Sequence, residues 1–188
     1  GPVGAWAGLL VVGALRVVLV QQCTFFINSL CHMVGTQPYS DRCSARDSWV
    51  MALVTYGEGY HNYHHEFQHD YRNGVKAWAF DPTKWSIMIL HKLGLVSDLR
   101  RVPTTKIVGA EMKEAKRKAE IRIAELSQQG TLSEQAVGKV NELVAKLGAN
   151  LEELEQAVSQ KVETSREKIK QWRKETRELT SQLSNLPA

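Results

Sequence analysis

The sequence has few cysteines and no concentration of charge. Cys23, Cys31 and Cys43 form no Cys-x-x-Cys pair, so they indicate neither a disulfide framework nor a zinc site. The 24 Lys and Arg residues outnumber the 20 Asp and Glu residues by only four, and no block of basic residues stands out. The charge pattern therefore argues against a nucleic-acid partner, and the cysteines are typical of buried thiols in a reducing compartment.

The composition changes at Pro103. All six histidines, all three cysteines and four of the five tryptophans come before it. The 85 residues that follow carry 15 Lys and Arg and 13 Asp and Glu. We therefore expect one module over residues 1–103 and a charged, amphipathic helical tail over residues 104–188. The chain has no initiator Met, and no charged segment precedes its first apolar run, so we expect it to begin inside a larger protein rather than with a signal peptide.

A long apolar run opens the chain. Residues 3–20 are apolar except for Arg16, and residues 24–27 extend the pattern. The run predicts a transmembrane helix over about residues 3–27, because a helix needs ~20 residues to cross a bilayer. A charge at the centre of a span costs roughly 2.5–3.5 kcal/mol, so we expect Arg16 near one membrane interface. A buried core helix of a soluble protein is the alternative.

Shorter elements follow the apolar run. Residues 36–48 are polar and predict a loop, and residues 49–56 predict a helix that continues into a histidine cluster. Asp81 is the expected cap of a helix over residues 83–93, which Gly94 ends. That helix is too short to span a bilayer, so we expect it on a membrane surface or against the protein body.

The tail has the pattern of long amphipathic helices. Residues 106–129 are helical in composition, and Thr131 opens a Thr-x-x-Glu capping box. Gly148 and Asn150 suggest a split into two helices. A helical hairpin or a coiled coil is expected; the tail then either self-associates or docks a partner, or it is a solvated hairpin without one. The apolar residues on a 3-4 spacing are Val137, Val140, Val144, Leu147, Leu151, Leu154 and Val158, and the pattern resumes in part at Trp172, Leu179 and Leu186.

Histidines carry the chemistry of the first module. His61, His64 and His65 stand at positions i, i+3 and i+4, which share one face of a helix. Neutral imidazoles bind iron, copper, nickel or zinc, so the spacing predicts a metal site without choosing the ion; a polar, partly exposed helix face is the alternative. His32 lies at the end of the apolar run, four residues after Asn28, and by itself is more typical of a buried histidine than of a ligand. We assign neither His69 nor His91 to a metal.

The segment Gly57–His65, with the sequence GEGYHNYHH, resembles the third histidine box of the membrane-bound fatty acid desaturases, in the acyl-CoA Δ9-desaturase (stearoyl-CoA desaturase) family. The segment Asn28–His32, with the sequence NSLCH, resembles the Asn-Ser-x-x-His segment that precedes that box. Residues 66–103 resemble the end of the bacterial members. The resemblance covers about residues 5–103.

This resemblance implies an all-α integral membrane scaffold and a di-iron centre. His32, His61, His64 and His65 would be iron ligands, and Asn28 would hold a metal-bound water. Members of the family use O2 and two electrons to place a cis double bond in an acyl chain, commonly at carbon 9, on an acyl-CoA or acyl-lipid substrate.

Three further roles follow by position. Phe25 and Phe26 are candidates for the wall of an acyl channel, with ordinary lipid-facing or core aromatics as the alternative. Glu58 is a candidate hydrogen-bond acceptor for a ligand imidazole, which would fix its tautomer, and a capping or surface Glu is the alternative.

The sequence also departs from the family. The two earlier histidine boxes are absent, so we expect this chain to be inactive by itself and to be part of a longer protein. No His-Pro-Gly-Gly of a cytochrome b5 domain is present. We therefore expect electrons from a separate donor such as a ferredoxin, a cytochrome b5 or a flavoprotein reductase.

The expected location is a membrane, with the bacterial inner membrane favoured and with the metal site and tail on the cytosolic side. The basic side chains agree with that side, since Arg42, Arg46, Arg72 and Lys76 would share it with the histidines. Two alternatives stay open: a related di-iron fatty acid hydroxylase, and a membrane-anchored coiled-coil interaction protein that descends from a desaturase without its activity.

Overall fold

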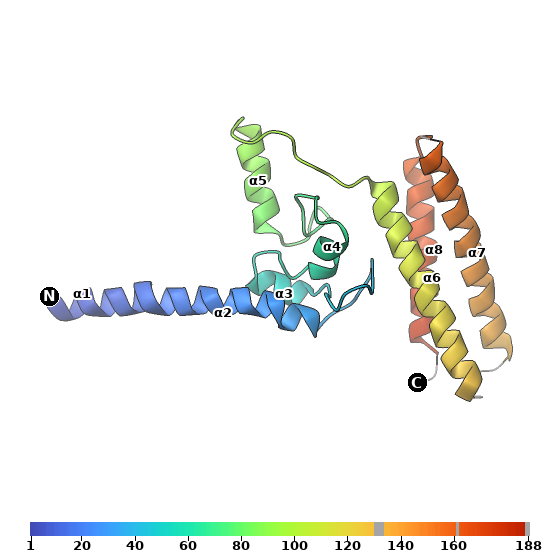
Figure 1. Ribbon diagram of the computed structural model, residues 1–188, viewed down its shortest axis with the longest axis horizontal. Coiled ribbons are helices and arrows are strands. Elements are labelled where there is room, and N and C mark those ends of the chain that lie inside the picture. The colour runs from blue at the N-terminus through green and yellow to red at the C-terminus, as the bar shows by residue number, and fades with distance from the viewer. Residues whose placement is uncertain (130–133, 161, 187–188) are drawn as a thin grey trace. The chain divides into compact units, whose positions relative to one another are not determined.

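The computed structural model describes residues 1–129, 134–160 and 162–186. The chain forms two compact units: residues 1–37 with 41–101, and residues 38–40 with 102–188. Every regular element in the described residues is a helix, as Figure 1 shows, which confirms the all-α expectation. Extended pairing there is limited to two isolated bridges, from Thr36 to Asp47 and from Asp47 to Tyr60.

The first unit opens with one long helix. It comprises α1 (Pro2–Gly8), a π-helical stretch η1 (Leu9–Leu15) and α2 (Arg16–Asn28), and a 3₁₀ turn, η2 (Leu30–His32), follows. This is the one helix of the described residues that is long and apolar enough to cross a membrane, and its apolar window is 0% buried. Within this chain, it is therefore not the buried core helix of a soluble protein.

Two short helices carry the rest of the candidate site. α3 (Trp49–Val54) begins at Ser48, whose hydroxyl accepts from the Met51 N–H, and α4 (His61–Glu66) starts at the first histidine of the cluster. The prediction of one helix from residue 49 into the histidines is wrong, because a turn separates α3 from α4. Tyr56 and Gly57 in this turn have φ angles of 55° and 103°, which a right-handed helix does not accommodate.

α5 (Pro82–Lys92) begins and ends as the sequence predicts. Asp81 accepts from the Lys84 N–H at 2.9 Å, and Pro82 occupies the first turn, where a missing N–H costs nothing. Gly94 follows the helix with a φ of 72°, a left-handed conformation that favours glycine. Trp85 and Ile89 stay exposed on the helix surface.

The second unit contains three helices in its described part, α6 (Thr104–Gln129), α7 (Glu134–Ser159) and α8 (Arg166–Ser184), each in contact with the other two. A hairpin has two helices, so the predicted hairpin omits the third helix that the structure contains. The apolar frame that weakens after residue 158 resumes in α8, where Trp172 and Leu179 are buried. The shared core comprises Val108, Met112, Ala115, Ala119, Val140, Leu147, Leu154, Trp172 and Leu179.

α7 is unbroken at Gly148 and Asn150, so the predicted split is wrong. The Asn150 side chain donates to Glu175 of α8, so it links two helices where a cap was expected. Burial opposes ionisation of Glu175, but hydrogen bonds from Lys146 and Gln171 lower the pKa of this carboxyl below its usual range.

The heptad residues of the tail pack within this chain. Val140, Leu147 and Leu154 are buried in the core of the second unit, so these residues are not exposed for contact with another chain. Self-association of the tail stays a prediction. The capping box predicted at Thr131 lies outside the described residues.

Candidate metal centre

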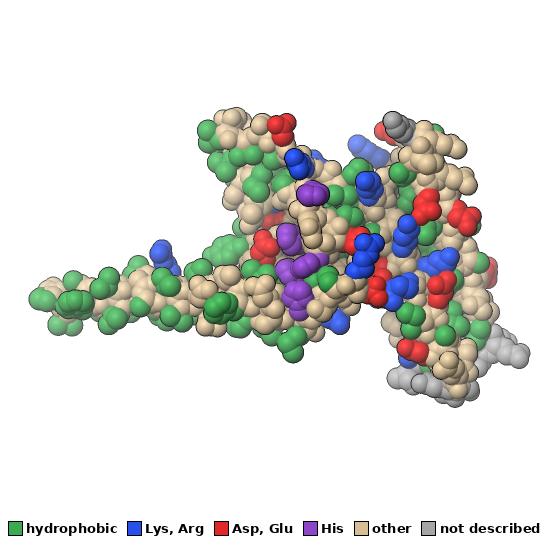
Figure 2. Space-filling model, in the orientation of Figure 1, with side chains coloured by type: hydrophobic (Ala, Val, Ile, Leu, Met, Phe, Trp, Pro, Cys, Tyr) green, Lys and Arg blue, Asp and Glu red, His purple; other side chains and the backbone are tan. Residues whose placement is uncertain are grey.

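Three histidine rings from two segments of the chain meet at one point. His32 ends the turn that follows the long helix, and His61 and His65 lie one turn apart on α4. The Nε2 atom of His61 lies 3.1 Å from that of His32 and 3.1 Å from that of His65. One ligand atom from each ring falls within 4.8 Å of the others, which is the spacing of a metal site. Figure 2 shows the imidazoles gathered beside the end of the long helix.

The surroundings of His61 and His65 favour their neutral forms. Burial, together with the neighbouring rings of His65, His32 and His64, lowers the pKa of His61 to about 4. Burial also lowers the pKa of His65. Neutral imidazoles offer nitrogen lone pairs, and the converging group of the described residues consists of histidines alone. The donor set fits a transition-metal ion such as iron, copper, nickel or zinc.

His64 is set apart from the other three rings. It stacks on His61 with 5.9 Å between ring centroids, and its centroid is also 5.9 Å from that of His65. It is not one of the three histidines whose nitrogens converge. His61 and His65 of α4 thus converge with His32, and the joint action of His61, His64 and His65 on a metal stays a prediction.

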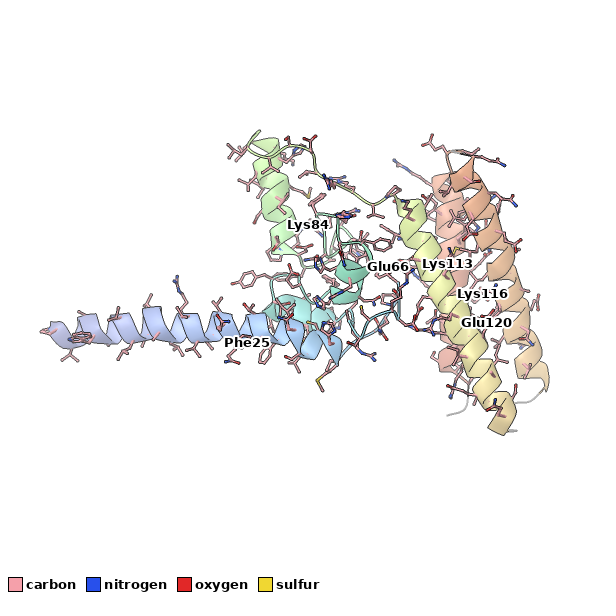
Figure 3. The ribbon with its side chains drawn as sticks, in the orientation of Figure 1. Phe25, Glu66, Lys84, Lys113, Lys116 and Glu120 are labelled. Carbon is pink, nitrogen blue, oxygen red and sulfur yellow. The ribbon has the colours of Figure 1, made fainter. Side chains whose placement is uncertain are left out.

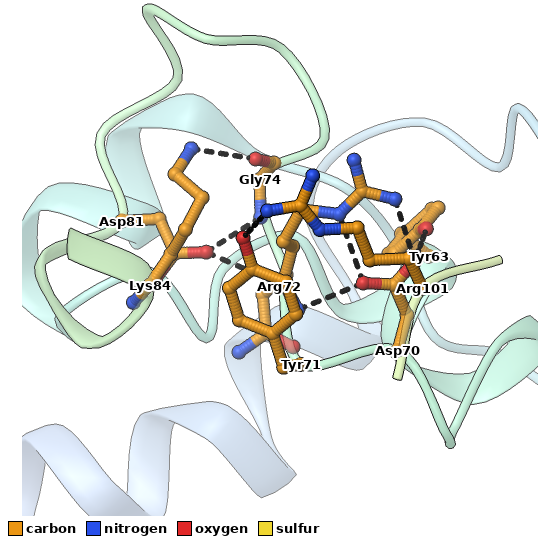
Figure 4. Close-up of polar contacts among 9 residues, drawn as sticks. Tyr63, Asp70, Tyr71, Arg72, Gly74, Asp81, Lys84 and Arg101 are labelled. Carbon is orange, nitrogen blue, oxygen red and sulfur yellow. Dashed lines mark hydrogen bonds and ion pairs between the residues drawn. The ribbon is translucent and has the colours of Figure 1, made fainter. Parts of the chain in front are cut away.

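α4 is fixed from the side opposite the converging rings. Tyr63 is fully buried, and its hydroxyl donates to Asp70 Oδ2 at 2.8 Å. Arg72 donates to both oxygens of Asp70, at 2.9 and 2.7 Å, as Figure 4 shows. Such a bidentate pair holds the carboxylate in one orientation, so Tyr63 has a fixed acceptor.

Removing the Tyr63 hydroxyl tests this support. We expect Tyr63→Phe to destabilise the first unit by about 1.5–3 kcal/mol, the range for a hydrogen bond to a charged group. The exposed Tyr71 hydroxyl, which accepts from Arg101, gives a matched control. Tyr71→Phe should stay within about 0.5 kcal/mol of the unchanged protein. Thermal unfolding of the purified protein in detergent measures both, and equal losses would contradict the assigned role.

A second polar cluster fixes the turn before α4. Asp81 accepts from the N–H groups of Asn73 and Gly74. The buried Lys84 ammonium donates to three backbone carbonyls of the loop that follows α4, and Figure 4 shows the one to the Gly74 carbonyl. The Asn73 side chain donates to Glu58 at 2.8 Å. Since Glu58 has this partner, its role as acceptor for a ligand imidazole stays a prediction.

The remaining predicted residues lie on α2. Asn28 is the exposed last residue of α2, four positions before His32. Phe25, which Figure 3 labels, is 52% exposed, and Phe26 is half-buried. His69 and His91 are exposed and lie outside the converging group. The Nδ1 atom of His91 is 2.8 Å from the Val96 carbonyl oxygen.

The sequence patterns missed Ser44 and Asp47. Ser44 Oγ lies 2.9 Å from Nδ1 of His32, and Asp47 Oδ1 accepts from the Tyr63 N–H at 3.1 Å. Burial raises the pKa of Asp47 to about 7, although the backbone N–H groups of Tyr63 and Asn62 oppose this rise. Both residues fall in the polar segment predicted as a loop, where periodicity carries no signal.

Comparison with known proteins finds sequence similarity to one family. The fatty acid desaturase family model matches residues 1–85. Acyl-CoA desaturase 1 of Saccharomyces cerevisiae is 45% identical over 120 residues, which are 64% of this chain and 24% of that protein. A probable acyl-CoA desaturase of Schizosaccharomyces pombe is 47% identical over 100 residues, 53% of this chain and 21% of that protein. An sn-2 palmitoyl-lipid 9-desaturase of Nostoc is 38% identical over 100 residues, 53% of this chain and 35% of that protein.

Residues 1–85 of this chain are therefore similar to the fatty acid desaturase family. The chain spans about a quarter of the length of the Saccharomyces relative. The two fungal relatives are more similar to it than the cyanobacterial one, so the bacterial type stays a prediction that these identities do not favour.

Proposed function

We propose that this chain supplies part of the di-iron centre of a fatty acyl desaturase, which places a cis double bond in a saturated acyl chain with O2 and two electrons. The observation that carries the proposal is the convergence of the His32, His61 and His65 Nε2 atoms from two separate segments. The iron centre supplies the power to remove hydrogen from an unactivated methylene pair, which side-chain acids and bases cannot do.

The geometry suggests how the ligands divide. His32, His61 and His65 would hold one iron, and His64, which lies apart from them, would hold the second. Asn28 would reach the first iron through a water. Four histidines are too few for two irons, so the remaining ligands come from segments outside these 188 residues and the chain is inactive alone.

The long helix suggests an integral membrane protein. α1 to α2 presents apolar side chains over most of its surface, as lipid requires, and Arg16, the one charged residue of the predicted span 3–27, would reach toward one interface. α5 runs across the direction of the long helix (Figure 1), and its exposed Trp85 and Ile89 suit the membrane surface. We place the histidines and residues 104–188 on the cytosolic side.

The substrate is an acyl chain on coenzyme A or on a lipid. Relatives named as acyl-CoA desaturases and as lipid 9-desaturases both support an acyl substrate, and position 9 is the corresponding proposal. Phe25 and Phe26 would line the acyl channel. The electron donor would be a separate ferredoxin, cytochrome b5 or flavoprotein.

Expression of the full-length gene in desaturase-deficient yeast tests the proposal. We expect gas chromatography of the cellular fatty acids to show new cis-monounsaturated acids, and iron to copurify with the protein. Hydroxy acids without new alkenes would assign the protein to the related hydroxylases. Protein with zinc in place of iron, and no new fatty acid, would support the non-catalytic interaction protein and would reject desaturation.

A further inference from the structure

One short segment bonds to both histidine-bearing parts of the site. Residues 44–48, here termed the linking segment, lie between His32 and α4 in the sequence. On the His32 side, Ser44 Oγ lies 2.9 Å from His32 Nδ1, and the Arg46 N–H donates to the Cys31 carbonyl at 2.8 Å. The ring of His32 and the backbone beside it are therefore both held by this segment.

The same segment holds the start of α4. The Asn62 side chain donates to the Ala45 carbonyl at 3.0 Å, and the Tyr63 N–H donates to the Asp47 carboxylate at 3.1 Å. The Ser48 N–H donates to the Gly59 carbonyl at 2.8 Å. Bonds to the two sides thus come from neighbouring residues of one chain segment, so the segment sets the separation of His32 from His61 and His65.

The linking segment is itself fixed. Asp47 and Thr36 exchange two backbone hydrogen bonds, of 2.7 and 3.0 Å. Gly35 has a φ of 123°, and a Cβ there would lie 2.4 Å from the Asp47 carbonyl oxygen, so the backbones approach as closely as glycine allows. Ala45 has no exposed surface. Little freedom is left for the residues that touch the ligand segments.

α4 needs an external acceptor. It has only six residues, and its N-cap, Tyr60, makes no side-chain capping bond. A helix this short does not persist by itself, because nucleation is costly. Asp47 supplies the missing acceptor from another part of the chain, and an acceptor of this kind stabilises a helix start.

Ser44 acts on the ring of His32. For Nε2 to present its lone pair to the converging rings, the proton of the neutral imidazole must sit on Nδ1. The Ser44 hydroxyl oxygen lies within hydrogen-bond distance of Nδ1 and accepts a hydrogen bond from its N–H in this tautomer.

We infer that Ser44 and Asp47 are positioning residues of the metal centre: Ser44 sets the tautomer and orientation of His32, and Asp47 sets the start of α4 and hence His61 and His65. This inference rests on the proposed function. Neither residue binds the metal itself; each acts through a ligand-bearing element.

The test uses the full-length protein that contains this chain, purified in detergent with its metal removed. We measure Fe²⁺ affinity by competition with a chelator, the ligand-field absorption of the Co²⁺-loaded protein, and the melting temperature of the metal-free protein. Ser44→Ala should weaken Fe²⁺ binding about 10–100-fold, the usual effect of removing the partner of a ligand histidine. It should also change the Co²⁺ spectrum with little change in melting temperature. Ser44→Thr, which keeps the hydroxyl, should restore both.

Asp47 gives a second pair of variants. Asp47→Ala should weaken Fe²⁺ binding to a similar degree, and Asp47→Asn, whose amide oxygen still accepts from the Tyr63 N–H, should retain most of it. Ser29→Ala is the matched control. Ser29 lies three residues before His32, and its hydroxyl donates to the Phe25 carbonyl of its own helix. If Asp47→Ala does not fold, the Ser44 variants decide the matter, because Asp47→Asn is expected to keep most of the Fe²⁺ binding.

His61→Ala separates two kinds of failure. If the unchanged protein binds no Fe²⁺, the proposed function fails. If His61→Ala loses Fe²⁺ while Ser44→Ala and a folded Asp47→Ala both bind Fe²⁺ as Ser29→Ala does, only the positioning inference is overturned. For Ser44→Ala, loss of metal affinity in proportion to a lowered melting temperature would also overturn the inference, because a purely structural role predicts that correlation.

Discussion

His61→Ala in the full-length protein is expected to abolish desaturation. His61 is 5% exposed, and its Nε2 atom is the one that lies 3.1 Å from both other converging nitrogens. Its loss removes a proposed iron ligand and leaves a cavity between the two remaining rings. We therefore expect activity to fall by more than about 100-fold, beyond the roughly 10–100-fold typical of a residue that only supports a ligand.

Gas chromatography of lipids from desaturase-deficient yeast measures this loss, and iron analysis of the purified variant shows whether the metal leaves with it. His91→Ala is the control, since His91 is exposed and lies outside the converging group. We expect it to keep near-normal activity. Substantial desaturation by the His61 variant would show that the rings converge without holding the metal.

Gly59→Ala should disrupt the candidate site through the backbone. A Cβ on Gly59 would lie 2.1 Å from the Ala52 nitrogen and 2.5 Å from the Met51 carbonyl carbon, distances that no side-chain rotation relieves. α3 and the turn before α4 must then separate, and the Ser48 to Gly59 hydrogen bond breaks. We expect a loss of about 3 kcal/mol or more, at or above the upper end of the range for overpacking.

Gly138→Ala is the matched control for Gly59→Ala. Gly138 lies in α7 with nothing within 4 Å of an added Cβ. Alanine is the better helix former there, so we expect a gain of about 0.5–1 kcal/mol. Thermal unfolding and limited proteolysis of the two purified variants give the comparison. Equal stability of both variants would contradict the close packing of α3 against the turn.

Local sequence patterns account for the helices that have clear signals. Each of these signals lies in one continuous stretch of sequence: the apolar run at residues 3–27, the Asp81-Pro82 start of α5 and the pattern of the long tail helices. The third tail helix was missed because its apolar residues are sparse and Glu175 occupies a buried position. Local pattern does not reveal the role of Asn150, because its partner, Glu175, is 25 residues away.

The candidate site depends more on tertiary contacts than on spacing. Successive helical residues turn by about 100°, so His65 lies about 40° from His61, and His64 lies about 60° away on the other side. Spacing alone does not decide which of these two rings turns toward His32. Ser44 and Asp47 stand in a segment without periodicity, and their partners, His32 and Tyr63, become visible only once the chain has folded.

The converging rings come from positions 29 residues apart. Holding such a loop closed costs roughly 3–4 kcal/mol of chain entropy, which the hydrogen bonds of residues 44–48 must offset when no ion is present. Ligand bonds to a shared ion would add to that offset, so metal loading and folding of this part become linked equilibria. The lifetime of the protein in a cell would then follow the iron supply, since the metal-free form opens this loop to proteases more often.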